Sequence, residues 1–146
     1  MNRKKQDTHR PTGVVVIVAV NILGWVATEG AWVYLYLAGR IPEMAQMGSY
    51  WERSYLGLVH GFSVADFIWS NIALLAGIAG LWKMKAWGWT AALMANTIWI
   101  YSMTFTLVRD LLVGVTFGMV FFLFFALFAL GSTVYLWKIR CHFWKS

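Results

Sequence analysis

The chain has 146 residues, of which 60% are hydrophobic and 12% are charged, and its formal net charge is +6. Soluble domains carry about 25% charged residues, so this composition excludes an ordinary soluble protein. The positive charges gather at the ends of long apolar runs, which argues against nucleic-acid binding.

Four apolar runs cover almost the whole sequence. They are residues 13–38, 57–82, 87–108 and 111–137. Each run reaches the roughly 20 residues that a helix needs to cross a bilayer. Because backbone polar groups find no water in the hydrocarbon, helices are the expected structure. We therefore predict an all-α, single-domain, four-helix transmembrane bundle in the cell membrane.

Nine of the twelve basic residues flank one set of run ends. They are Arg3, Lys4, Lys5, Arg10, Lys83, Lys85, Lys138, Arg140 and Lys145. The opposite ends carry only Arg40, Arg53 and Arg109. This asymmetry predicts that both termini and the 83–87 loop are cytoplasmic, where basic residues also meet anionic lipid headgroups.

The first run follows a basic segment, as the core of a signal peptide does. It is longer than the about 7–15 residues of such a core and contains Glu29, so we interpret it as a retained anchor. The next segment, 39–56, mixes charges with Tyr50, Trp51 and Tyr55. We predict that it lies along the outer interface, with these rings at headgroup level.

The remaining runs are predicted to be connected by short turns. Spans two and three form a hairpin through LWKMKAWGW at 81–89, with its tryptophans at the inner interface. Arg109 and Asp110 are predicted to form the outer turn before span four. That span contains FFLFFALF at 121–128 and is predicted to face lipid over most of its surface.

Two acids fall inside the predicted spans, Glu29 in the first and Asp66 in the second. An acid at membrane depth costs about 2.5–3.5 kcal/mol on insertion scales, so each one requires a partner or a function. Both lie roughly 13–14 Å below the outer end of their run, at 1.5 Å per residue. Tyr101 of span three reaches a similar depth, so we predict that the three side chains share one layer.

Further polar residues predict a polar interior that opens to the outer side. On span two, His60, Ser63, Asp66, Ser70 and Asn71 fall within an arc of about 140°. The predicted ligand-binding residues are Glu29, Asp66, His60, Tyr101, Trp25, Trp32, Asn71 and Asn96, with Asn96 expected to meet Asn71. The alternative is that these residues only pack helices together, at under about 1 kcal/mol for each hydrogen bond.

Motifs for metals and cofactors are absent from the sequence. It contains no CxxC, no HExxH, and no glycine-rich nucleotide-binding motif. Of the three histidines, His9 and His142 lie outside the predicted spans, which excludes paired haem ligation within one chain. The single cysteine, Cys141, allows no intramolecular disulfide. We therefore expect no metal and no cofactor.

Three resemblances can be named, and none of them places the chain in a characterised family. Glu29 between Trp25 and Trp32 resembles the span-one carboxylate of small multidrug resistance transporters, but the longer outer loop and the second acid depart from that family. Paired acids on the first two spans are loosely similar to the sterol-isomerase and sigma-2-like membrane fold. The stretch HGFSVADFIWSNIALLAGIAGLWKMKAWGW resembles uncharacterised small four-span proteins of bacteria and archaea. This last resemblance covers about a fifth of the chain and implies no activity.

The sequence is compatible with three functions. The first is binding or transport of protons or of a small amphipathic or cationic ligand, with Glu29 and Asp66 providing charge. A monomer of four helices encloses little volume, so transport would require a homo-oligomer. The second is an accessory subunit of a larger membrane complex. The third, a lipid-modifying enzyme that uses the two acids, ranks lowest because no nucleophile or cofactor motif accompanies them.

Overall fold

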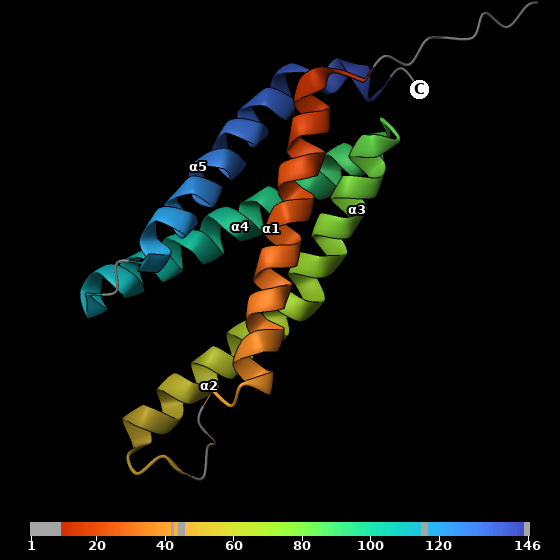
Figure 1. Cartoon of the computed structure of the whole chain (residues 1–146). Coiled ribbons are helices and arrows are strands. Elements are labelled where there is room, and N and C mark those ends of the chain that lie inside the picture. Colours follow the sequence, from red (N-terminus) through yellow and green to blue (C-terminus); the bar gives the residue numbers. More distant parts are fainter. Residues whose placement is uncertain (1–9, 42, 44–45, 115–116, 145–146) are drawn as a thin grey trace, which may run out of the picture.

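The computed structural model describes residues 10–41, 43, 46–114 and 117–144, and the regular structure within these ranges is entirely helical. In chain order the elements are α1 (Thr12–Leu37), α2 (Tyr50–Ala65), the π-helix η2 (Asp66–Ser70), α3 (Asn71–Trp82), α4 (Ala86–Val113), α5 (Phe117–Lys138) and the 3₁₀-helix η3 (Arg140–His142) (Figure 1). Since α2, η2 and α3 follow one another without a break, they form one continuous helix.

Four helices of the described part of the chain are long and apolar enough to cross a membrane. They are Thr12–Leu37, Tyr50–Trp82, Ala86–Val113 and Gly118–Lys138. The prediction of an all-α chain with four candidate spans is therefore confirmed. Large apolar side chains are exposed on all four helices, which implies that they contact the lipid bilayer.

The predicted interfacial segment 39–56 is only partly irregular, because a helix begins at Tyr50. Ser49 and Glu52 form a capping box at this point. The hydroxyl of Ser49 accepts a hydrogen bond from the Glu52 N–H at 3.1 Å, and the Glu52 carboxylate accepts one from the Ser49 N–H at 2.9 Å. The two bonds satisfy backbone N–H groups that a helix start would otherwise leave unpaired.

The predicted outer turn at Arg109 and Asp110 is wrong. Both residues lie inside α4, which continues to Val113 and ends at Gly114, where φ is 77°. Arg109 forms an ion pair with its neighbour Asp110 at 2.6 Å, and Asp110 is buried. The two opposite charges compensate each other within the helix, so this pair does not mark the end of the helix.

The two ends of the bundle differ in their charge. The terminal end, as we name it, holds the start of α1, the α3–α4 turn and the end of α5, and the loop end lies opposite (Figure 1). Arg10 Nε donates a hydrogen bond to the Trp82 carbonyl oxygen at 2.7 Å, which joins the start of α1 to the α3–α4 turn. The described basic residues at the terminal end are Arg10, Lys83, Lys85, Lys138 and Arg140. The other basic residues that were predicted for this side, Arg3, Lys4, Lys5 and Lys145, lie outside the described residues, as does His9.

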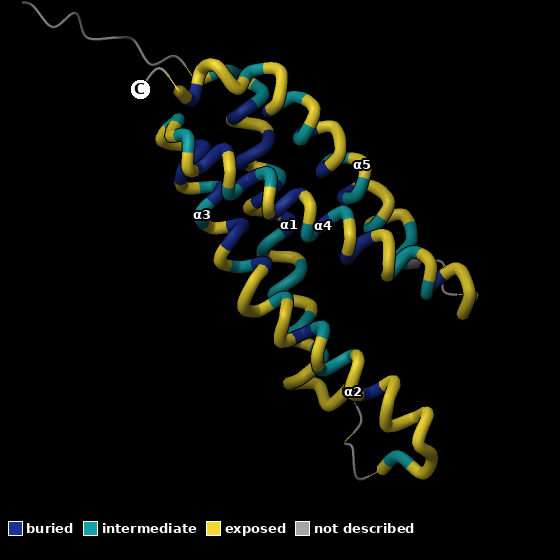
Figure 2. Tube along the Cα trace, turned by 180° about the vertical axis from the view of Figure 1, so that it is seen from behind, coloured by how far each residue is buried: buried dark blue, intermediate teal, exposed yellow. Residues whose placement is uncertain are grey.

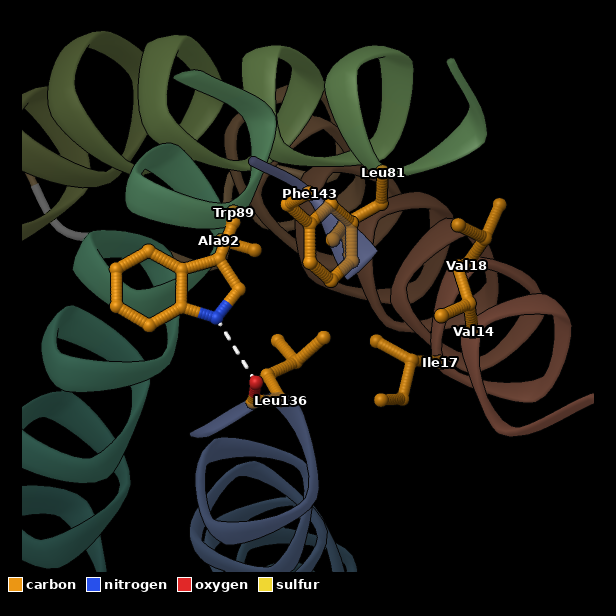
Figure 3. Packing of buried hydrophobic residues seen from close by; sticks show 8 residues of the cluster. All are labelled: Val14, Ile17, Val18, Leu81, Trp89, Ala92, Leu136 and Phe143. Atoms are coloured by element: carbon orange, nitrogen blue, oxygen red, sulfur yellow. Dashed lines mark hydrogen bonds between the residues drawn. The ribbon is translucent and has the colours of Figure 1, made fainter. Parts of the chain in front are cut away.

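A hydrophobic cluster joins α1, α3, α4 and α5 at the terminal end (Figure 3). Within it, Trp89 Nε1 donates a hydrogen bond to the Leu136 carbonyl oxygen at 2.9 Å. Phe143 follows η3 directly, and its side chain packs in the same cluster and is only 1% exposed. The last described residues therefore close the terminal end of the bundle.

The predicted hairpin between spans two and three is confirmed, since residues 83–85 alone separate α3 from α4. The two helices approach closely at glycines. A Cβ atom added to Gly80 would overlap the backbone of Gly88, and one added to Gly88 would overlap Gly80. One added to Gly77 would lie 3.0 Å from the Ala92 Cα atom. Small residues at these positions allow the two backbones to come into contact.

Burial decreases toward the loop end. Helix α2 is exposed over most of its surface (Figure 2), and its buried residues are Leu56 and Ser63. At this end α2 diverges from the α4–α5 pair (Figure 1). The loop end is therefore less closely packed than the terminal end.

Candidate functional site

The π-helix η2 begins at one of the two predicted acids, Asp66. The backbone N–H of Asn71 bonds to the carbonyl oxygen of Asp66, five residues earlier. In an α-helix, residues five apart point to different faces, whereas the wider π turn brings them toward the same face. This turn allows both side chains to reach α1.

Two tryptophans of α1 donate hydrogen bonds to these side chains. Trp32 Nε1 donates to Asp66 Oδ2 at 3.3 Å, and Trp25 Nε1 donates to Asn71 Oδ1. The Asn71 Nδ2 group in turn donates to Glu29 Oε1 at 2.9 Å. We call this group of side chains the acid seam; it consists of Trp25, Glu29, Trp32, Asp66 and Asn71. The seam brings together five of the eight predicted site residues.

Both acids of the seam are held by neutral donors. Besides the indole of Trp32, Asp66 accepts a long hydrogen bond of 3.4 Å from the hydroxyl of Ser70. Glu29 Oε2 is buried and has no hydrogen-bond partner within the described residues. Neither carboxyl group forms an ion pair with a described residue. The structure therefore leaves hydrogen-bonding capacity at both acids.

His60 lies on the same side of the helix but outside the acid seam. The hydroxyl of Tyr36 is 3.1 Å from His60 Nδ1 and 2.7 Å from Ser63 Oγ. These contacts form a second polar link between α1 and α2, nearer the loop end. Ser63 is almost completely buried, so this link also packs the two helices together.

Tyr101 does not join the acid seam. Its side chain is 68% exposed and lines a separate groove that is formed by residues of α4 alone. The predicted layer of Glu29, Asp66 and Tyr101 is therefore wrong. Helix α4 buries Trp99 and Met103 instead, which turns Tyr101 away from the bundle.

Asn96 also lies apart from the seam. Its Nδ2 group donates hydrogen bonds to Ser132 Oγ at 2.9 Å and to Thr133 Oγ1 at 3.0 Å, both on α5. The predicted contact with Asn71 is wrong, because the amide of Asn71 bonds to α1. Asn96 is buried and links α4 to α5.

A groove with a volume of about 1210 Å³ lies between α1–α2 on one side and α4–α5 on the other. Apolar and aromatic side chains form most of its walls, and Phe62 stacks on Phe105 with ring centres 5.1 Å apart. Among the described residues that line it, Asp66 is the only acid, since Glu29 does not reach the groove. The groove and the acid seam therefore meet at Asp66 and Trp32.

The stacked rings align α2 with α4, which runs antiparallel to it. Asp66 follows Phe62 by about one turn, and Ser102 precedes Phe105 by about one turn, so the two lie at a similar level of the groove. Arg109 lies seven residues from Ser102, or about 10 Å along the helix axis toward the loop end. The groove therefore has an acid at its deeper end and a guanidinium nearer its mouth.

The guanidinium and the acid differ in their partners. Arg109 is paired with Asp110, so its positive charge is compensated locally. Asp66 has no basic partner within the described residues. Among the described residues that line the groove, Asp66 is therefore the acid without a basic partner.

Several residues of this region are not apparent from the sequence alone. Tyr36, Ser132 and Thr133 were not predicted as partners, because hydropathy does not indicate which helix faces meet. The groove walls were also missed, since phenylalanines in an apolar run are equally consistent with lipid contact. For the start of α2 a signal exists, because Ser49 and Glu52 fit the S-x-x-E pattern.

Within the described ranges, no group of three or more His, Cys, Asp or Glu side chains lies close enough to hold a metal ion. Comparisons with protein-family models, with curated proteins and with solved structures yield no match for this chain.

Proposed function

We propose that this membrane protein binds an amphipathic ligand with a cationic group in the groove between α1–α2 and α4–α5. The observation that carries the proposal is Asp66, an acid without a basic partner, in the wall of an otherwise mainly apolar groove. The cation would lie at Asp66, and the apolar part of the ligand would contact the aromatic walls. Aromatic faces also attract cations, which adds to the selectivity.

The size of the groove supports a ligand of this class. Its volume of about 1210 Å³ exceeds the about 300–1,000 Å³ that is usual for small-molecule sites. An acid inside an apolar helix costs about 2.5–3.5 kcal/mol on insertion scales. A ligand that pairs with Asp66 offsets part of this cost, which explains why an acid is present at this point.

Glu29 would have a supporting role in this proposal. It bonds to Asn71, which in turn bonds to Trp25, so it stabilises the α1–α3 contact beside the binding site. Its second carboxylate oxygen is buried next to this network. Coupling of ligand binding to protons would use this second acid, and transport would add a change of access that requires more than one conformation.

Replacement of Asp66 tests the proposal with a pair of probes of similar shape and opposite charge. The parent protein in lipid nanodiscs should bind tetraphenylphosphonium more tightly than tetraphenylborate. Asp66→Asn should weaken binding of the cation about tenfold or more, equivalent to about 1.4 kcal/mol, and leave binding of the anion unchanged. Equilibrium dialysis measures both affinities, with empty nanodiscs as the reference for partitioning into lipid.

Glu29→Gln is the matched control, because Glu29 does not line the groove. This variant should retain the preference for the cation. The proposal fails if the parent binds both probes equally, or if Glu29→Gln and Asp66→Asn lose the same affinity. In the latter case the acids would support the fold together and neither would select the ligand.

An accessory-subunit function is the alternative, and the exposure of α2 favours it. On this helix Gly57 and Gly61 lie four residues apart, and a Cβ added to either would contact nothing within 4 Å. Small residues at this spacing are typical of close contacts between membrane helices. Native mass spectrometry after mild extraction would separate the two proposals, since one predicts a retained small molecule and the other a stoichiometric polypeptide.

We also propose that the terminal end faces the cytoplasm, because basic residues accumulate on that side of membrane proteins. Cys141 is exposed, lies at the terminal end and is the only cysteine of the chain. In intact cells, a membrane-impermeant maleimide should therefore label Cys141 only after the membrane is permeabilised. The variant Cys141→Ser with Gln46→Cys moves the thiol to the loop end and should be labelled without permeabilisation. The opposite pattern would reverse the proposed orientation.

A further inference from the structure

Basic and tryptophan side chains from three separate parts of the chain gather at the terminal end. We call this group of side chains the collar. It consists of the described cations Arg10, Lys83, Lys85, Lys138 and Arg140 and the tryptophans Trp82, Trp87, Trp137 and Trp144. The four indoles are 45–59% exposed, so they are not part of the packed core.

The collar contains no acidic side chain among the described residues. The described acids are Glu29, Glu43, Glu52, Asp66 and Asp110, of which two lie in the acid seam and three toward the loop end. The first turn of α4, which begins in the collar, also contains no acid. The positive charge of the collar is therefore not compensated by described residues.

Two arginines of the collar are held against its tryptophans. The guanidinium carbon of Arg10 lies 4.3 Å from the ring centre of Trp82, and that of Arg140 lies 5.2 Å from the ring centre of Trp137. Arg10 also donates through Nε to the Trp82 carbonyl oxygen at 2.7 Å. Within the described residues, the terminal N–H groups of both guanidinium groups have no hydrogen-bond acceptor, so they can donate to a phosphate.

The collar combines two features that belong to the surface of a membrane. Indole rings prefer the headgroup region, where the ring is in an apolar medium and the N–H group meets water. Lysine and arginine at the same level meet the phosphates of the lipids. Both features surround helices that are long and apolar enough to cross the bilayer. A lipid headgroup therefore fits this surface better than a soluble anion.

We propose that the collar selects anionic phospholipids over zwitterionic ones. The phosphates of these lipids contact the lysines and the exposed guanidinium groups, and their upper acyl chains contact the indoles. Lipid binding at the collar is independent of ligand binding in the groove, because no residue of the collar lines the groove.

Quenching of tryptophan fluorescence by brominated lipids tests the selection. The protein is reconstituted in vesicles of equal parts phosphatidylglycerol and phosphatidylcholine, with bromine on the chains of one lipid or of the other. Around the parent, quenching should show the anionic lipid enriched about fivefold over the zwitterionic one. Addition of 1 M salt should reduce this enrichment, since the screening length falls to about 3 Å.

Charge-neutral variants locate the effect. Lys83→Gln combined with Lys85→Gln and Lys138→Gln should lower the enrichment to about twofold or less, because three of the five described cations are removed. Arg40→Gln combined with Arg53→Gln removes exposed cations from the loop end and should leave it unchanged. Arg10 and Arg140 are kept in both variants, because their contacts with tryptophan contribute to the fold.

Three outcomes would overturn the proposal. They are equal quenching by the two lipids in the parent, an enrichment that does not respond to salt, and an enrichment that the loop-end variant loses as strongly as the collar variant. If the triple variant does not purify as a folded species, Lys83→Gln alone gives the same test. The salt dependence of the parent decides the question without any variant.

Discussion

Gly80→Ala should strongly destabilise the protein, although it adds only one methyl group. The new Cβ atom would overlap the backbone of Gly88, which is part of a helix and has no rotamer with which to move away. Helices α3 and α4 would have to separate, at a cost of about 3 kcal/mol or more. The midpoint of thermal unfolding in mild detergent should fall sharply, and part of the protein should aggregate during purification.

Gly131→Ala is the matched control for this change. Gly131 also lies inside a membrane helix, but a Cβ added there would contact nothing within 4 Å. Its unfolding midpoint should equal or slightly exceed that of the parent, because alanine is the better helix former. Equal midpoints for the Gly80 and Gly131 variants would show that α3 and α4 do not pack as closely as described.

Phe143→Ala should open the terminal end of the bundle. The Phe143 ring is 1% exposed and packs among residues of α1, α3, α4 and α5. Its removal leaves a cavity that the four helices can only partly fill, so the expected loss is about 3–5 kcal/mol. The free energy of unfolding in mixed detergent micelles measures this loss directly.

A second readout separates loss of packing from general damage. When the tail detaches, trypsin should cleave after Arg140 faster in Phe143→Ala than in the parent, because Arg140 lies in the short helix η3 that precedes Phe143. For the stability measurement, Cys141→Ala is the control, since this side chain is exposed and its replacement should change the free energy by less than about 0.5 kcal/mol. If Phe143→Ala retains the stability of the parent, the tail does not contribute to the core.

The sequence predicts the four spans well, because a run of 20 apolar residues is itself the physical requirement for crossing a bilayer. The same signal does not define where each helix ends. Arg109 and Asp110 resemble a solvated turn, yet they satisfy each other inside α4, and Gly114 ends the helix instead. Helix α2 begins earlier than the apolar run because a capping box at Ser49 stabilises its first turn.

The candidate site is predicted less completely than the fold. The tryptophans beside Glu29 and the polar face of span two do meet in the structure, since polar groups in a membrane find one another. The sequence does not set the rotation of helices that are apolar all round, and Tyr101 and Asn96 were therefore misplaced. The π turn at Asp66 also changes which residues share a face, and the regular spacing of an α-helix cannot anticipate it.

The continuous helix from Tyr50 to Trp82 has a consequence for the bilayer around the protein. Its 33 residues measure about 50 Å, whereas the hydrocarbon region is about 30 Å thick. The helix must therefore tilt steeply or extend beyond the hydrocarbon at the loop end, where its first turns are the most exposed. With a steep tilt, the mouth of the groove would lie near the boundary between headgroups and acyl chains. A molecule dissolved in that leaflet could reach Asp66 by lateral diffusion and would not need to pass through the aqueous phase.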